Sequence, residues 1–259
     1  MIYHVQFPGL GLDLTVNRVA LAIGGFNIYW YGVIIAAGML LAMLYAFRNA
    51  VDYGIDSDRL VDVVAIGTVM AIVCARIYYV AMAPFEYQSL WDMIDIRKGG
   101  IAIYGAVIGA FVFGGLAAKW RKVPLLPLFD LVSLGFLIGQ GIGRWGNFVN
   151  QEVYGGVVTN EALQWFPFAV FIDKVQEWHY AFFFYESMLN LIVFALLFTF
   201  MWKFFKKPNG LALCGYLFAY GTTRSVMEPL RDGEFILGSN IPVSQVMAII
   251  MAVGGVVLA

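Results

Sequence analysis

The chain of 259 residues is 61% apolar and only 13% charged, which is about half of the roughly 25% charged share of a soluble globular domain. This composition indicates a membrane protein. Sixteen Lys and Arg against seventeen Asp and Glu give a formal net charge of −1, which excludes the global basic field that would bind nucleic acid, and the apolar content excludes a disordered chain. The two cysteines, Cys74 and Cys214, lie far apart in apolar stretches, so neither a disulfide framework nor a thiolate metal site is indicated.

A helix needs about 20 apolar residues to cross the hydrocarbon layer of a bilayer. The sequence offers about seven such stretches, and we expect one integral membrane domain over residues 1–259 with an all-α fold, a polytopic membrane helix bundle. In chain order, the expected spans lie at roughly 21–47, 60–82, 101–118, 126–146, 181–202, 211–228 and 241–259. Glycines punctuate the third and fourth spans, and in a membrane they more often mark close helix packing than breaks.

The distribution of Lys and Arg predicts the orientation, because short cytoplasmic connections carry an excess of these residues. They follow the first, third and fifth spans: Arg48, Arg59, Lys119, Arg121, Lys122, Lys203, Lys206 and Lys207. The N-terminus is therefore expected outside and the C-terminus in the cytoplasm. The opposite segments 83–100, 147–180 and 229–240 are longer and richer in carboxylates, so the functional site is expected to face outward.

The densest set of polar residues lies at 140–156, where a glycine-rich helix is expected to reach the external surface. If this segment is helical, Gln140, Arg144 and Asn147 share one face. An Arg at the centre of a membrane helix costs on the order of 2.5–3.5 kcal/mol, so ionisable residues near spans are functional candidates. The alternative is an interfacial Arg that extends to lipid phosphates while amides cap the end of the helix.

A second set, Arg224, Glu228 and Arg231, has the spacing i, i+4 and i+7 at the outer end of the sixth span, which predicts a shared helical face. Pro229 is expected to bend or end the helix just before Arg231. Glu228 could simply neutralise one Arg in a buried pair. Two Arg with one Glu nevertheless leave a positive charge, and Arg suits bidentate recognition of a phosphate.

Smaller signals accompany these sets. Tyr29 and Trp30 fit an ordinary aromatic belt. Arg76, deep in the second span, is expected either to extend outward or to pair with an acid, whereas a structural role is favoured for Asp130. His179, at the start of the fifth span, fits an interfacial residue or a catalytic one equally well.

These residues carry a resemblance to a family. The run GRWGNFVNQEVYGG at 143–156 resembles the signature of prolipoprotein diacylglyceryl transferases, integral membrane enzymes of bacteria. The resemblance extends over nearly the whole chain, through WYG at 30–32, ARIYYV at 75–80, GGIAIYGAVIG at 99–109, PLFD at 127–130, YES at 185–187, RSVMEPLRD at 224–232 and SQ at 244–245.

The resemblance implies a reaction. Family members transfer the diacylglyceryl group of phosphatidylglycerol to the thiol of the lipobox cysteine in a prolipoprotein signal peptide. A thioether forms and glycerol phosphate leaves, at the outer face of the bacterial cytoplasmic membrane. Since the leaving phosphate must hold its negative charge in a low-dielectric site, preorganised cations are the main requirement and a base for the thiol is the second. No metal or nucleotide motif is found, and no cofactor is expected.

The resemblance also implies site residues. Arg144 matches the family's lipid-phosphate arginine, and Arg224 matches an arginine regarded as essential. Tyr104 stands where some members carry histidine, so it is either a base or only a hydrogen-bond donor. His179 lacks the proline that commonly follows it in the family, which leaves its role open. The remaining expected substrate-binding residues are Tyr31, Asn147, Asn150, Glu152, Glu228 and Arg231.

Two other classes compete with this interpretation. An anionic-lipid transporter or lipid-binding membrane protein would hold the head group without chemistry, but it would be expected to show repeated halves and broken midplane helices, which the sequence lacks. A purely structural scaffold would not explain the unfavourable burial of Arg76, Arg224 and Arg231.

Overall fold

The computed structural model describes residues 2–7, 12–24, 26–83, 87, 89–96, 99–204, 209–230, 236–237 and 241–259. The chain forms two compact units. The first comprises Met1–Ala46 and Phe129–Ala259, and the second comprises Phe47–Leu128. Each unit is described by itself.

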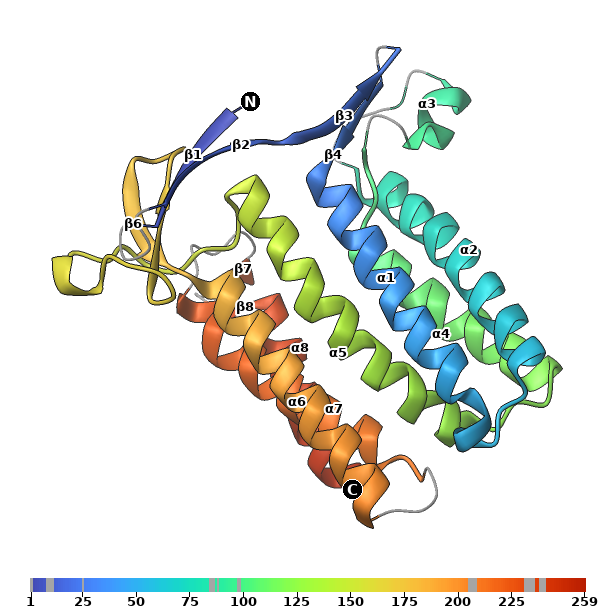
Figure 1. Cartoon of the computed structure of the whole chain (residues 1–259). Coiled ribbons are helices and arrows are strands. Elements are labelled where there is room, and N and C mark those ends of the chain that lie inside the picture. Colours follow the sequence, from blue (N-terminus) through green and yellow to red (C-terminus); the bar gives the residue numbers. More distant parts are fainter. Residues whose placement is uncertain are drawn as a thin grey trace. The chain divides into compact units, whose positions relative to one another are not determined.

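Helices dominate the described chain, as predicted for a membrane helix bundle (Figure 1). Their bounds are α1 Trp30–Asn49, α2 Ser57–Met82, α3 Leu90–Ile94, α4 Ile103–Trp120, α5 Leu125–Asn150, α6 Phe182–Phe204, α7 Leu211–Met227 and α8 Val243–Leu258. Except for the short α3, each of these overlaps one of the expected spans.

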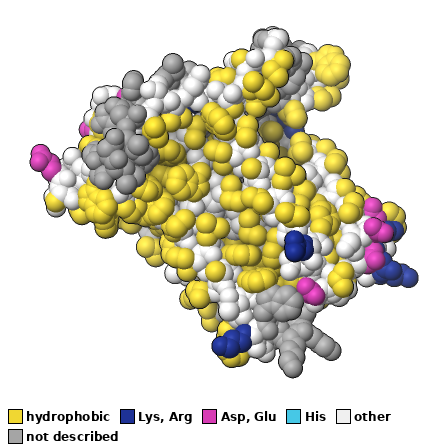
Figure 2. Space-filling model, viewed as in Figure 1, with side chains coloured by type: hydrophobic (Ala, Val, Ile, Leu, Met, Phe, Trp, Pro, Cys, Tyr) yellow, Lys and Arg dark blue, Asp and Glu magenta, His cyan; other side chains and the backbone are white. Residues whose placement is uncertain are grey.

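Four described segments are long and apolar enough to cross a membrane: Trp30–Tyr53, Ser57–Met82, Leu125–Asn150 and Phe182–Met201. Tyr104–Trp120 and Ser244–Leu258 are shorter apolar helices. The number of crossings and the orientation of the termini stay predictions. On the face shown in Figure 2, hydrophobic side chains cover most of the surface and few charges interrupt them, as lipid contact requires.

Short antiparallel hairpins, which the sequence analysis did not predict, accompany the helices. They pair β1 (Ile2–Phe7) with β2 (Leu12–Asn17), β3 (Val19–Ile23) with β4 (Phe26–Tyr29), β5 (Ala169–Ile172) with β6 (Glu177–Tyr180), and β7 (Ile236–Leu237) with β8 (Ile241–Pro242). The described residues of the region 21–29 therefore belong to β3, β4 and the turn at Gly24, which has a φ of 54°.

The first helix begins at Trp30, so the prediction of helix from residue 21 was wrong. Apolar content alone does not separate a strand from the start of a membrane helix. The fourth expected span also runs further than predicted, because α5 continues to Asn150. Asn147 and Asn150 therefore stand on the helix and not in an external loop.

Glycines allow close helix packing in the first unit, as predicted. A Cβ atom on Gly38 of α1 would lie 3.2 Å from the carbonyl oxygen of Gly139 on α5, and one on Gly146 would lie 3.0 Å from the ring of Tyr31. A Cβ atom on Gly221 of α7 would lie 2.5 Å from the Ala248 carbonyl oxygen on α8. Small residues thus bring these helix backbones together.

Asp130 on α5 fixes the start of α7. Its side chain is fully buried. The backbone N–H groups of Asn209, Gly210 and Leu213 donate to its two carboxylate oxygens at 3.0, 2.8 and 2.9 Å. The first N–H groups of a helix have no partner within the helix, so the carboxylate acts as a cap from a neighbouring helix. The predicted structural role of Asp130 agrees with this geometry.

The second unit is built on the packed pair α2 and α4, which lie side by side in Figure 1. A Cβ atom on Gly105 would lie 2.4 Å from the Cys74 carbonyl oxygen, and one on Gly109 would lie 2.5 Å from that of Met70. At the opposite end of the pair, Arg121 Nε lies 2.7 Å from an Asp62 carboxylate oxygen.

Candidate functional site

Arg144 stands in the C-terminal part of α5 and pairs with a carboxylate of another helix. Its Nη2 atom lies 2.5 Å from Oε2 of Glu186, in the first turns of α6. The side chain of Arg144 is 15% exposed and that of Glu186 is 4% exposed. Glu186 falls within the YES match at 185–187 but was not among the expected site residues, since nothing local in the sequence joins it to Arg144.

Glycines on both sides of Arg144 bring α5 close to the neighbouring helices. Cβ atoms on Gly143 and Gly146 would lie 3.1 Å from Ile35 and 3.0 Å from Tyr31, both of α1. On another side of α5, a Cβ atom on Gly141 would lie 3.0 Å from Leu191 of α6. These glycines thus allow α5 to pack closely against α1 and α6.

Arg224 and Glu228 form the ion pair that their i, i+4 spacing predicted. Arg224 Nη2 lies 2.8 Å from Glu228 Oε2, and the side chains are 22% and 13% exposed. The helix α7 ends at Met227, and Glu228 opens a short 3₁₀ turn that contains Pro229, which agrees with the predicted effect of the proline. Arg231 lies outside the described residues.

The structure brings the two pairs into one electrostatic neighbourhood. Arg144 interacts electrostatically with Tyr31 of α1, with Tyr220 and Arg224 of α7, and with Glu228. Two largely shielded guanidinium groups repel each other strongly where water is scarce. The carboxylates of Glu186 and Glu228 offset this repulsion, so the four groups are balanced in charge and largely removed from water.

Uncharged side chains brace the same helices. Gln140 Nε2 donates to the hydroxyl of the buried Tyr216 at 2.9 Å, which links α5 to α7. Trp145 Nε1 donates to the fully buried hydroxyl of Ser187 at 3.1 Å, which links α5 to α6. These two hydrogen bonds hold α5, which carries Arg144, against α7 and α6. No local pattern predicts Tyr216 and Ser187 as partners, because they come from segments far along the chain.

The end of the signature run is tied to the rest of the first unit. Asn150 is buried, and its Oδ1 accepts a hydrogen bond from Arg18 Nε at 3.2 Å. The carbonyl oxygen of Asn150 accepts from Lys174 Nζ at 2.8 Å. Asn147 is half-buried, and its carbonyl oxygen accepts from the backbone N–H of the exposed Glu152 at 2.9 Å. Asn150 therefore joins α5 to two other segments.

His179 lies on the strand β6 and is buried, and its part in the site stays a prediction. The residue is 4% exposed, and its Nδ1 lies 2.8 Å from the Gly155 carbonyl oxygen. Its ring centroid is 4.4 Å from that of Tyr154, and its Nε2 is 3.6 Å from a Glu177 carboxylate oxygen. These contacts connect the strand to the residues that follow α5.

Tyr104 belongs to the second unit, at the start of α4. The residue is 45% exposed, and its ring centroid lies 6.4 Å from that of Tyr78 on α2. Tyr104 is thus carried by the α2–α4 pair, whereas the two arginine–glutamate pairs belong to the first unit.

Arg76 of the second unit binds backbone carbonyls, which neither of its two predicted arrangements included. Its Nε donates to Met93 O at 2.8 Å, its Nη2 to Asp92 O at 2.6 Å, and its Nη1 to Gly99 O and Gly100 O at 2.9 and 2.8 Å. Gly100 has a φ of 82°, and a Cβ atom there would lie 2.3 Å from Nη1. Since these bonds occupy most of its N–H groups, Arg76 is an anchor for the segment between α2 and α4.

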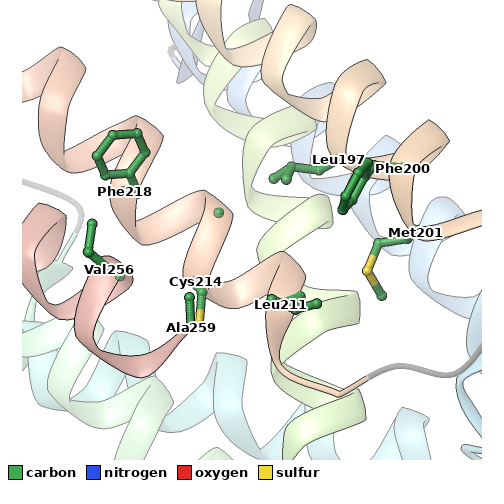
Figure 3. A pocket seen from close by; sticks show the side chains of 10 residues that line it. Leu197, Phe200, Met201, Leu211, Cys214, Phe218, Val256 and Ala259 are labelled. Atoms are coloured by element: carbon green, nitrogen blue, oxygen red, sulfur yellow. The ribbon is translucent and has the colours of Figure 1, made fainter. Parts of the chain in front are cut away.

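An apolar groove lies elsewhere in the first unit, along α6, α7 and α8 (Figure 3). It has a volume of about 360 Å³. Its lining includes Leu197, Phe200, Leu211, Cys214, Phe218 and Val256, and none of the predicted site residues lines it. Among the described residues, no group of three or more His, Cys, Asp or Glu is placed to hold a metal ion.

Comparison with known proteins decides between the classes that the sequence left open. Residues 18–259 match the family described as prolipoprotein diacylglyceryl transferase. The chain belongs to the prolipoprotein diacylglyceryl transferase family. A relative from Clostridium perfringens, named phosphatidylglycerol–prolipoprotein diacylglyceryl transferase 1, is 37% identical over 246 residues, which cover 93% of each chain.

Two further members of the family carry the same name without a number. The one from Bacillus cereus is 39% identical over 249 residues, covering 93% of this chain and 90% of the relative. The one from Lysinibacillus sphaericus is 36% identical over 251 residues, covering 94% and 91%. Membership in this family, together with the apolar helices, identifies a multi-pass membrane protein and favours the transferase over the transporter.

Proposed function

We propose that this protein transfers the diacylglyceryl group of phosphatidylglycerol to the lipobox cysteine of a prolipoprotein signal peptide. Family membership supports the reaction. The observation that carries the proposal in the structure is the neighbourhood of Arg144 and Arg224, two shielded cations each held by a carboxylate. Such a site suits a substrate whose reacting end is a phosphodiester and whose leaving group is a phosphate.

The reaction balances without a cofactor. The cysteine thiol gives up its proton to a base, for which Tyr104 as a phenolate is the candidate, and the thiolate attacks the glyceryl carbon that is bonded to a phosphodiester oxygen. A carbon–sulfur bond forms as the carbon–oxygen bond breaks, and the electron pair stays on the departing oxygen. The products are a thioether and glycerol phosphate, whose second negative charge appears during the transfer.

The arginines act on that developing charge. Arg144 and Arg224 are already oriented and poorly hydrated, so they stabilise the leaving phosphate without the reorganisation that water would require. Glu186 and Glu228 balance the charges of Arg144 and Arg224, and the phosphate competes with them for the guanidinium N–H groups. We also propose that Arg231, which lies outside the described residues, binds the substrate phosphate as a further cation.

The other proposed roles rest on the family's motif positions, and for Tyr31 also on its contact with α5. Tyr31 lines the site, since its ring lies against Gly146 and interacts with Arg144. Asn147, Asn150, Glu152 and His179 support the outer end of the site. Tyr104 is proposed either as the base for the thiol or as a hydrogen-bond donor; a tyrosine, with an ordinary pKa near 10, acts as a base only where cations favour its phenolate.

We place the reaction at the outer leaflet of the bacterial cytoplasmic membrane. Arg144 and Arg224 occupy the C-terminal parts of α5 and α7, while Tyr31 and Glu186 occupy the N-terminal parts of α1 and α6. Helices that alternate in direction bring these ends to one side of a membrane. The cytoplasmic Lys and Arg of the predicted topology support the outer side, where a secreted cysteine meets a phospholipid.

The first experiment tests substrate and reaction together. Purified protein in micelles containing phosphatidylglycerol is incubated with a lipobox peptide and analysed by mass spectrometry. We expect a mass increase equal to one diacylglyceryl group, and none for a peptide with Ser in place of the lipobox Cys. If no mass shift is seen under conditions in which a known transferase works, the proposed function is wrong.

Substitution of the arginines tests the site. We expect Arg144→Ala and Arg224→Ala to lose turnover while the protein still inserts and keeps its elution profile in detergent. Lys203→Ala, at an exposed lysine near the C-terminal end of α6, serves as a control for the loss of one cation in the same unit, and it should weaken turnover far less. Activity near that of the wild type in either arginine variant would remove that arginine from the site.

A further inference from the structure

The start of α8 holds two polar residues, Ser244 and Gln245, for which the proposed mechanism has no role. Both are half-buried. About one turn further along α8, this helix packs tightly against α7. A Cβ atom on Gly221 of α7 would lie 2.5 Å from both the Ala248 carbonyl oxygen and the Ala252 nitrogen of α8. The backbones of α7 and α8 are therefore in direct contact next to Ser244 and Gln245.

Both residues bind the end of α7 that carries Arg224. The Ser244 hydroxyl donates to Oε1 of Glu228, while Oε2 of the same carboxylate lies 2.8 Å from Arg224 Nη2. Gln245 Nε2 donates to the Ser225 carbonyl oxygen at 3.1 Å. One helix thus holds both the carboxylate that pairs with Arg224 and the backbone turn next to it.

We propose that Ser244 and Gln245 are positioning residues that hold Arg224 in the orientation needed for the transfer reaction. This inference rests on the proposed function. The serine fixes the rotation of the Glu228 carboxylate, so that one oxygen stays directed at the guanidinium. The glutamine fixes the last turn of α7, on which Arg224 stands.

The physical reason lies in the freedom of the side chains. Arginine has many rotamers, and holding one of them is unfavourable in entropy unless neighbours restrict the alternatives. A cation stabilises developing charge best when it needs no reorientation during the reaction. Neither Ser244 nor Gln245 carries a charge, so they influence the reaction through Glu228 and the α7 backbone.

The test compares Ser244→Ala, Gln245→Met and the double variant with the wild type in the lipobox peptide assay. Since a hydrogen bond to a charged group is removed, we expect kcat to fall about tenfold for Ser244→Ala, with a smaller change in KM for phosphatidylglycerol. Ser244→Thr keeps a hydroxyl group and should recover most of the rate. Thr222→Ala, which removes an exposed hydroxyl from α7, is the matched control.

A double-mutant cycle separates positioning from a general effect on packing. In an Arg224→Lys background, Ser244→Ala should lower the rate by less than twofold, because residues that act through the same group are not additive. The inference is wrong if Ser244→Ala and Gln245→Met retain wild-type kcat, if their losses match that of Thr222→Ala, or if the loss from Ser244→Ala persists in full in the Arg224→Lys background.

The two proposals fail in different ways. If the wild-type protein does not convert the peptide, the proposed function and the inference that rests on it are both refuted before any variant is compared. If the wild type converts the peptide and the variants do so equally fast, only the positioning role is refuted.

Discussion

The pair formed by Arg144 and Glu186 gives the sharpest prediction for catalysis. Glu186 is 4% exposed and lies 2.5 Å from the guanidinium, on a different helix from Arg144. Glu186→Gln keeps the shape of the side chain and one oxygen acceptor but removes the negative charge. Glu186→Ala removes the partner altogether and leaves a shielded guanidinium without this carboxylate.

The expected magnitudes follow from this burial. A hydrogen bond to a charged group contributes about 1.5–3 kcal/mol. If that interaction orients Arg144 in the transition state, its loss in Glu186→Gln lowers kcat about 10- to 100-fold, since 1.4 kcal/mol corresponds to a factor of about ten. Breaking a buried ion pair by removing one partner destabilises a protein by about 3–5 kcal/mol. Glu186→Ala should therefore also lower the midpoint of thermal unfolding.

The assay measures initial rates of lipobox peptide conversion by mass spectrometry, with phosphatidylglycerol varied to separate kcat from KM. Thermal unfolding in detergent is followed on the same preparations. Glu161→Gln, at an exposed glutamate of the same unit, is the matched control and should change neither quantity. Wild-type kcat in a folded Glu186→Gln variant would refute the view that this carboxylate orients Arg144.

Three further predictions concern the rest of the molecule. Asp130→Ala removes three backbone hydrogen bonds at the start of α7 and should destabilise the protein by at least about 1–3 kcal/mol, seen as a lower thermal midpoint. Arg76→Lys, which has only three donors on one nitrogen, should also lower that midpoint, whereas Arg121→Lys at the opposite end of the α2–α4 pair should change it little. If Tyr104 is the base, we expect Tyr104→Phe to lower kcat about 10²-fold or more and to alter the pH profile. If Tyr104 only donates a hydrogen bond, we expect a smaller loss of kcat at all pH values. Unchanged rates across pH would contradict both roles.

Local patterns in the sequence predicted the features that depend on near neighbours. The apolar stretches located the long helices because hydrophobic length is set by the bilayer and does not depend on tertiary contacts. The i, i+4 spacing of Arg224 and Glu228 predicted their ion pair because a helix brings such positions together wherever it lies. The boundary at Trp30 was missed because apolar residues before it form a hairpin instead of another helical turn.

The sequence by itself determined a membrane protein with scarce charges, and its motifs determined the family. Only the tertiary structure decided which groups those charges meet. It paired Arg144 with Glu186, directed Asp130 to the start of α7, and surrounded Arg76 with backbone carbonyls. These partners come from segments far apart in the chain. Because water is scarce where they lie, each charge requires a partner, but the packing of the helices determines which partner it finds.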